Sequence, residues 1–160
     1  MVPHWQTPYL GIRTLPRVSS WEIDHFFTLE LEEREEICTR FRGVNRLGVA
    51  LQLCFLRMTG CPLDGVRILP TELLSHVGRQ LEIDIPTIAS VRALYRRKRT
   101  RYDHQQWAMA RLGFSPLTSG RRRVLTTRLK QQARSTGEVD ALIEFARRWL
   151  FDQRIVIPSK

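Results

Sequence analysis

Arginine is the residue whose type and clustering in this sequence are best suited to chemistry with a partner. Of the 26 basic residues, 23 are arginine, and the three lysines are Lys98, Lys130 and Lys160. The planar guanidinium group donates paired hydrogen bonds that match a phosphate group or the edge of a guanine base. The composition therefore predicts binding to an anion, although a GC-rich genome would give the same preference for arginine.

The positive charge is concentrated in one part of the sequence. The formal net charge is +10, yet the first 80 residues carry nine basic and nine acidic side chains. Residues 85–134 carry 13 basic side chains and a single acid, Asp103. A block this one-sided repels itself unless a polyanion neutralises it. Nucleic acid is the favoured partner, and the alternatives are a merely solvated basic face or an acidic membrane or protein.

Two clusters in this block are candidates for contact with DNA. The first lies at the junction of two predicted helices, where a turn can aim several guanidinium groups at phosphates. The second follows Thr118 at a predicted helix start, where free backbone N–H groups also favour a phosphate. The glutamines that could read adenine, or that are ordinary exposed helix residues, are Gln105, Gln106, Gln131 and Gln132. The candidate residues are Arg92, Arg96, Arg97, Lys98, Arg99, Arg101, His104, Gln105, Arg121, Arg122, Arg123, Arg128 and Lys130.

The sequence lacks the motifs of catalytic and metal sites. Its acids show no pairing pattern, and no phosphate-binding glycine loop, nucleophile elbow or zinc-binding helix motif occurs. The four histidines are dispersed, and Cys38, Cys54 and Cys61 form no C-x-x-C pair, which indicates small buried thiols. We expect no catalytic residue, metal, cofactor, small-molecule substrate or membrane, and a cytoplasmic location.

The elements that must position these side chains are predicted to be helices, about seven and short, in an all-α fold. A Ser19-x-x-Glu22 capping box opens the first of them, and a Ser135-x-x-Glu138 box is expected to open the last. Pro86 is expected in the first turn of a helix that carries Val91. Apart from the helix near Pro86, the predicted helices cover residues 19–27, 29–42, 44–58, 71–81, 100–112, 118–133 and 138–153.

The order of these helices predicts the organisation of the domain. Residues 44–58 are apolar on nearly every side, so this helix should form the centre of the core. Residues 59–70 should form a loop and residues 154–158 an extended end. We expect a helix-turn-helix-like bundle over residues 15–158, with possible subdomains 15–84 and 85–158, after a poorly defined segment of residues 1–14.

The run G-V-N-R-L-G-V-A-L-Q-L-C-F-L-R at residues 43–57 resembles the N-terminal domain of Tn3 family transposases. The resemblance continues through P-T-E-L-L at residues 70–74, the T-R-x-x-H element at residues 100–104 and L-G-F-x-P at residues 112–116. It covers residues 15–158, with matching order and spacing. Residues 1–14 lack the helical run that usually precedes the Leu-Pro pair seen here at residues 15–16.

The resemblance implies a helical region that binds the terminal inverted repeats of a transposon and delivers them to a catalytic domain that has no counterpart here. Within the signature, Asn45, Arg46 and Gln52 could contact DNA or form structural hydrogen bonds, and Arg46 joins the candidate DNA-binding residues. The expected partner is double-stranded DNA, with the bacterial nucleoid as location. The alternative is a stand-alone or truncated module that dimerises with a full-length transposase subunit and modulates it.

Overall fold

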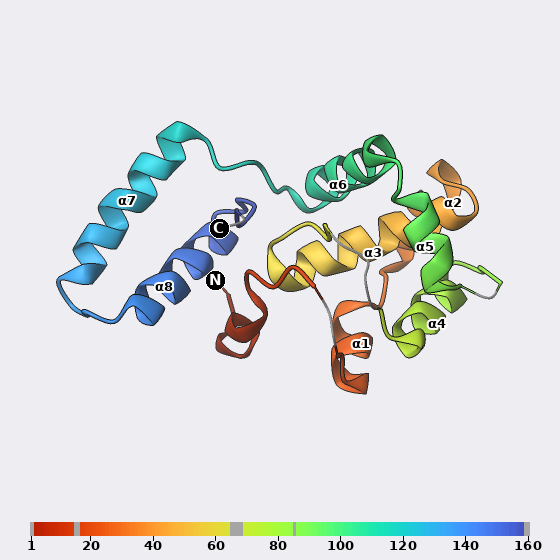
Figure 1. Ribbon diagram of the computed structural model, residues 1–160, viewed down its shortest axis with the longest axis horizontal. Helices are drawn as coiled ribbons and strands as arrows, with labels where there is room; N and C mark the ends of the chain where they lie inside the picture. Colours follow the sequence, from red (N-terminus) through yellow and green to blue (C-terminus); the bar gives the residue numbers. More distant parts are fainter. Residues whose placement is uncertain (1, 15–16, 65–68, 85, 159–160) are drawn as a thin grey trace.

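A computed structural model describes residues 2–14, 17–64, 69–84 and 86–158 (Figure 1). These residues contain eight α-helices and one 3-10 helix, and their only pairing of extended backbone is an isolated bridge between Ser115 and Ile155. The all-α prediction is confirmed. In chain order the elements are η1 (His4–Tyr9), α1 (Ser20–Phe26), α2 (Leu31–Arg40), α3 (Val44–Thr59), α4 (Thr71–Gln80), α5 (Ile88–Leu94), α6 (Lys98–Leu112), α7 (Ser119–Ala133) and α8 (Val139–Asp152).

Helix α3 is the centre of the core, as its apolar pattern predicts. Twelve of its 16 residues are buried, and η1, α1, α2, α4, α5 and α6 all pack against it. Gly43 precedes the helix with φ +58°, and Gly60 ends it in the left-handed conformation with φ +72°. Glycine adopts both conformations without steric cost, so the helix begins and ends at the two glycines. Helices from both sides of the expected boundary at residues 84 and 85 share this core.

Local hydrogen bonds set the starts of several helices. Ser19 and Glu22 form the predicted reciprocal capping box of α1, and Glu30 with Glu33 forms another at the start of α2. Thr118 accepts a hydrogen bond from the Arg121 N–H and so caps α7. These contacts fix the first turns of three helices before any tertiary packing is considered.

Two expected helix starts are wrong. Pro86 lies before the N-cap of α5, because the Thr87 side chain accepts from the Ser90 N–H and the helix begins at Ile88. The box of Ser135 with Glu138 does not form. Instead the Thr136 hydroxyl accepts from the Glu138 N–H, and α8 begins one residue later.

Both end segments pack onto the α3 core. In the N-terminal segment, Val2 and Leu10 are buried, and the Gln6 side chain donates to the carbonyls of Arg57 and Met58 at 3.0 and 3.1 Å. At the other end the Ile157 N–H donates to the carbonyl of Gly60. The motif positions Leu15 and Pro16, and residues 65–68 of the expected loop, lie outside the described residues.

Helices α7 and α8 lie side by side at one end of the molecule, where they pack on each other (Figure 1). An extended connection of residues 113–118 joins α6 to α7 and is fastened to the C-terminal segment. The Ser115 N–H donates to the carbonyl of Arg154, and the Val156 N–H donates to the carbonyl of Ser115, each at 2.9 Å. The rings of Phe114 and Phe151 meet at 5.6 Å between centroids. These contacts hold the start of α7 in place relative to the core.

Candidate nucleic-acid interface

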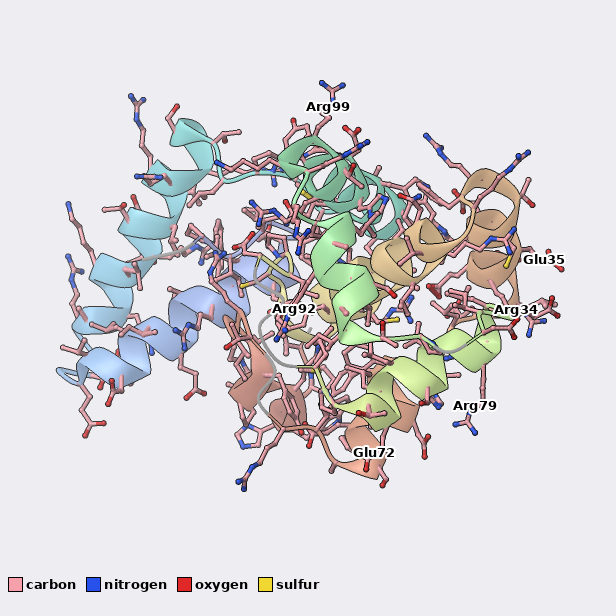
Figure 2. The ribbon with its side chains drawn as sticks, turned by 45° about the vertical axis from the view of Figure 1, so that its right-hand side comes forward. Arg34, Glu35, Glu72, Arg79, Arg92 and Arg99 are labelled. Carbon is pink, nitrogen blue, oxygen red and sulfur yellow. The ribbon has the colours of Figure 1, made fainter. Side chains whose placement is uncertain are left out.

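Helix α7, together with its C-cap residue, carries six basic side chains. Leu125 is the only buried residue of the helix, and the helix contains no acid. None of its six basic side chains forms an ion pair with another residue that the structure describes. In Figure 2 nitrogen-tipped side chains project from the outer side of α7, away from α8. The six exposed basic residues are Arg121, Arg122, Arg123, Arg128, Lys130 and Arg134.

The sequence of α7 is unfavourable for a helix in water without a partner. Like charges three and four residues apart repel each other, and three arginines in the first turn oppose the helix dipole. An anion placed along the helix and at its first turn removes both costs. The arrangement is therefore suited to a polyanion.

The junction of α5 and α6 forms a second, smaller group of exposed cations. Arg92, Arg96, Arg97 and Lys98 are exposed there. The Arg99 side chain points outward from α6 in Figure 2, and its Nε lies 3.1 Å from Asp103 Oδ1. The acid of the basic block thus neutralises one of the arginines that the sequence assigned to DNA.

Two further candidates of this cluster bind the chain itself. Arg101 Nη1 donates to the carbonyl of Asp64 at 2.8 Å. Gln105 Nε2 donates to the carbonyl of Leu63 and to Asp64 Oδ1, each at 3.3 Å. These side chains hold the segment after α3 against α6, and they offer less to DNA than the sequence predicts.

His104 belongs to the core, contrary to the prediction that places it on the basic surface. Its ring is 3% exposed, its Nδ1 lies 3.0 Å from the Tyr95 hydroxyl, and the Phe41 ring meets it edge-on. Burial lowers the pKa of His104 below its ordinary value, and the neighbouring Asp103 partly opposes that shift. A buried neutral imidazole does not reach a DNA groove.

Two of the three candidates within the motif of residues 43–57, Arg46 and Gln52, form structural hydrogen bonds. Arg46 donates to the carbonyls of Cys38 and Phe41, which closes the end of α2. Gln52 is 1% exposed, and its amide donates to the carbonyl of Leu63 and accepts from the Leu63 N–H. The polar groups of both side chains form hydrogen bonds with the backbone of neighbouring segments.

Apart from Arg92, the exposed basic residues of the 85–134 block lie on α7 with its C-cap and around the start of α6. Helices α6 and α7 border the same edge, joined by the extended connection (Figure 1). Helix α6 and this connection contribute at most about 22 Å and about 20 Å to the separation of the two groups, given the rise per residue. The two groups are therefore at most about 42 Å apart, which is little more than one turn of B-DNA, about 34 Å. Both groups can therefore face one duplex.

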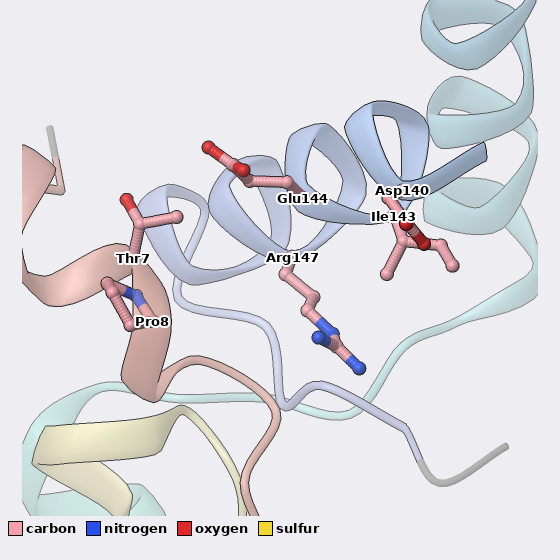
Figure 3. Close-up of a pocket in the computed structure, with 6 residues that line it drawn as sticks. All are labelled: Thr7, Pro8, Asp140, Ile143, Glu144 and Arg147. Atoms are coloured by element: carbon pink, nitrogen blue, oxygen red, sulfur yellow. The ribbon is translucent and has the colours of Figure 1, made fainter. Parts of the chain in front are cut away.

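The opposite face of α8 carries the other sign of charge. A cleft of about 420 Å³ between η1 and α8 is lined by Asp140 and Glu144 as well as by Arg147 (Figure 3). The Arg147 guanidinium packs so closely on Gly11 that a Cβ there would lie 2.7 Å from Nε. The carboxylates of this cleft would repel phosphates, so the cleft is less suited to DNA than the α6 and α7 side.

Neither a metal site nor a membrane span is found in the described residues. No group of three or more His, Cys, Asp or Glu side chains in them is arranged to hold a metal ion. No helix in that part of the chain is both long and apolar enough to cross a bilayer.

The sequence analysis did not predict that α7 exposes every side except one narrow apolar face. The spacing of Leu125 and Leu129, four residues apart, could have indicated that face.

The chain was compared with known proteins. A family model described as a domain of unknown function, DUF4158, matches residues 9–160. The transposase for insertion sequence element IS1071 in transposon Tn5271 of Comamonas testosteroni is 41% identical over 154 residues, which are 96% of this chain and 16% of the relative. The transposase for transposon Tn1546 of Enterococcus faecium is 25% identical over 139 residues, 87% of this chain and 14% of the relative. The chain thus spans about one sixth of the length of these curated relatives.

Proposed function

The chain belongs to the DUF4158 family, and from its transposase relatives and its basic surface we propose that it is a non-catalytic domain of a transposase that binds double-stranded DNA. The transposases that it matches confirm the resemblance to Tn3 family transposases carried by residues 43–57. In this proposal the domain recognises the terminal inverted repeats of its transposon and needs no cofactor. It would act at the bacterial nucleoid, where the DNA lies.

The observation that carries the proposal is the set of six exposed cations on α7, which no described acid neutralises. Duplex DNA presents one negative charge for about every 1.7 Å of its axis, and cations that replace its counterions gain affinity by releasing them. The cations at the start of α6 add a second contact with the same duplex. Helices α5 and α6, joined by residues 95–97, keep the helix-turn-helix-like order of the expected bundle, and in this proposal the cations at their junction contact the DNA backbone.

Binding of the full chain to labelled duplexes tests the proposal. One duplex carries the terminal inverted repeat of the element that encodes the chain, and a second has the same composition in scrambled order. We expect both to bind at low salt and the repeat to bind at least about ten-fold more tightly at physiological salt. Equal affinity would reject recognition of the repeat, and no binding to either duplex would reject the DNA-binding function.

A second candidate function is that of a protein-interaction module that dimerises with a full-length transposase. It is favoured by Trp5 and Trp21, which are 45% and 53% exposed and whose rings meet at 5.7 Å between centroids. Exposed tryptophans are common at the centres of protein interfaces. Light scattering of the chain, alone and mixed with transposase, tests this function. A complex that Trp21→Ala abolishes would support it, and a monomer in both samples would reject it.

A further inference from the structure

We propose that α7 is the helix that enters the major groove, and that it presents one defined stripe of side chains to the base edges. This inference rests on the proposed DNA-binding function and deepens it, because it names the reading helix and its reading face. Three observations support it: one face of α7 packs on α8, the opposite face carries exposed side chains that can contact bases, and α6 has no comparable face.

The packing of α7 sets its orientation. Leu125 is buried, Leu129 and Gln132 are half-buried, and these three positions share one face of the helix, which packs on α8. Successive residues are about 100° apart around a helix axis, so the opposite face is determined. The stripe opposite the packing face consists of Gly120, Arg123, Thr127, Lys130 and Arg134, with Gln131 beside it. All six of these residues are exposed.

The stripe carries side chains that can distinguish base pairs. Arg123 can donate two hydrogen bonds to guanine O6 and N7, and Gln131 can pair with adenine. The Thr127 hydroxyl donates to the carbonyl of Arg123 at 3.1 Å, so its methyl group is the part left for a thymine methyl. Nothing lies within 4 Å of a Cβ built on Gly120, so the backbone at this end is open to close approach.

The remaining cations of α7 flank the stripe. Arg121, Arg122 and Arg128 lie at the sides of the packing face, between α8 and the stripe. With the stripe in a groove about 12 Å wide, side chains at these angles reach the phosphates along its rims. Arg121 is held in place by a hydrogen bond of 3.0 Å to the Ser115 hydroxyl. Reading and anchoring are thus assigned to different faces of one helix.

Helix α6 is less suited to reading. One of its faces is buried on α3 through His104, Trp107 and Ala108. Its outer face carries Asp103, whose carboxylate binds Arg99 and would repel the phosphates that line a groove. The cations at its start are therefore assigned to contacts with the DNA backbone.

Selection from a pool of random duplexes of about 30 base pairs tests the inference on the full chain. The proteins to compare are the wild type, Arg123→Lys, Gln131→Ala and the control Arg34→Lys, which lies on α2, away from α7 in Figure 2. Arg123→Lys keeps the charge and loses the bidentate hydrogen bonds to guanine. Its affinity for the unselected pool should therefore stay within about two-fold of the wild type. We expect the wild type to select a consensus, and Arg123→Lys to lose about ten-fold or more of the preference for one guanine. Arg34→Lys should select the wild-type consensus.

The outcomes separate this inference from the function on which it rests. Wild-type binding to the pool without any consensus would overturn the reading role and leave DNA binding in place. A consensus that neither Arg123→Lys nor Gln131→Ala changes would also overturn it. Failure of the wild type to bind the pool at low salt would overturn both. Loss of one base preference in each α7 variant, with the control unchanged, would support the reading face.

Discussion

At the scale of single residues, a small contact site between α3 and α6 explains why His104 is buried in the core. Gly48 leaves room there for Tyr95 and His104, which lie where a side chain would otherwise be. The motif of residues 43–57 shows a glycine in a helix, but its partners are 46 and more residues away. The role of His104 therefore depends on a tertiary contact, which its own sequence neighbourhood does not contain.

Replacement of Gly48 by alanine tests this close approach. The added Cβ would lie 2.6 Å from Leu94 Cδ2 and 2.9 Å from the Tyr95 hydroxyl oxygen. We expect Gly48→Ala to lower the free energy of unfolding by about 1–3 kcal/mol, measured by urea denaturation. The matched control is Gly120→Ala, which has open space and should raise stability by up to about 1 kcal/mol. Equal effects of the two changes would contradict the tight packing.

Acidification tests the burial of His104. Burial lowers the pKa of His104 in the folded state below the ordinary value of 6.5, so the unfolded chain binds more protons as the pH falls through that value. The free energy of unfolding should therefore fall from about pH 6.5 downwards until the folded-state pKa is reached. In His104→Gln this part of the pH dependence should disappear. Identical pH profiles of the two proteins, measured by urea unfolding, would show that the ring is accessible to protons when folded.

At the scale of elements, the helices were predictable because their signals are local. The box of Ser19 and Glu22 and the glycines at 43, 60 and 113 mark helix ends at the predicted places, within two residues. The box of Ser135 failed because Thr136 supplied a competing acceptor. The sequence could not predict which residues of the basic block contact the protein and which stay exposed. Ion pairs such as Arg111 with Glu36, at 3.1 Å, join helices that are distant in the sequence.

The stability of α7 tests its dependence on a partner. Because Leu125 is its one buried residue and its charges repel each other, its backbone amides should exchange with solvent faster than those of α3. DNA should slow the exchange of α7 amides by about ten-fold or more, while α3 should change little. Leu125→Ala should speed exchange in α7 alone, and Leu117→Ala, in the connection, is the control for a nearby truncation. Uniform exchange across both helices would contradict a weakly held α7.

At the scale of the whole molecule, the chain separates a core from a charged edge. Helix α3 and its neighbours supply a conventional apolar centre, and α7 with the start of α6 carries the net positive charge that the composition showed only as a total. The sequence predicted the basic block and its partner class. The structure shows that Arg101 and Arg111 of the block, like Arg46 of the motif, are engaged with the protein.

The salt dependence of affinity for a duplex of about 30 base pairs tests most directly the claim that α7 carries DNA binding. Each lost phosphate contact flattens a plot of log affinity against log salt by roughly 0.9. The combined change Arg121→Gln, Arg122→Gln and Arg128→Gln should therefore flatten it by about 2 to 3 units. The control, Arg34→Gln with Arg79→Gln, removes charges from α2 and α4, away from α7 in Figure 2, and should leave the slope within about half a unit. An α7 variant with the wild-type slope would contradict the account.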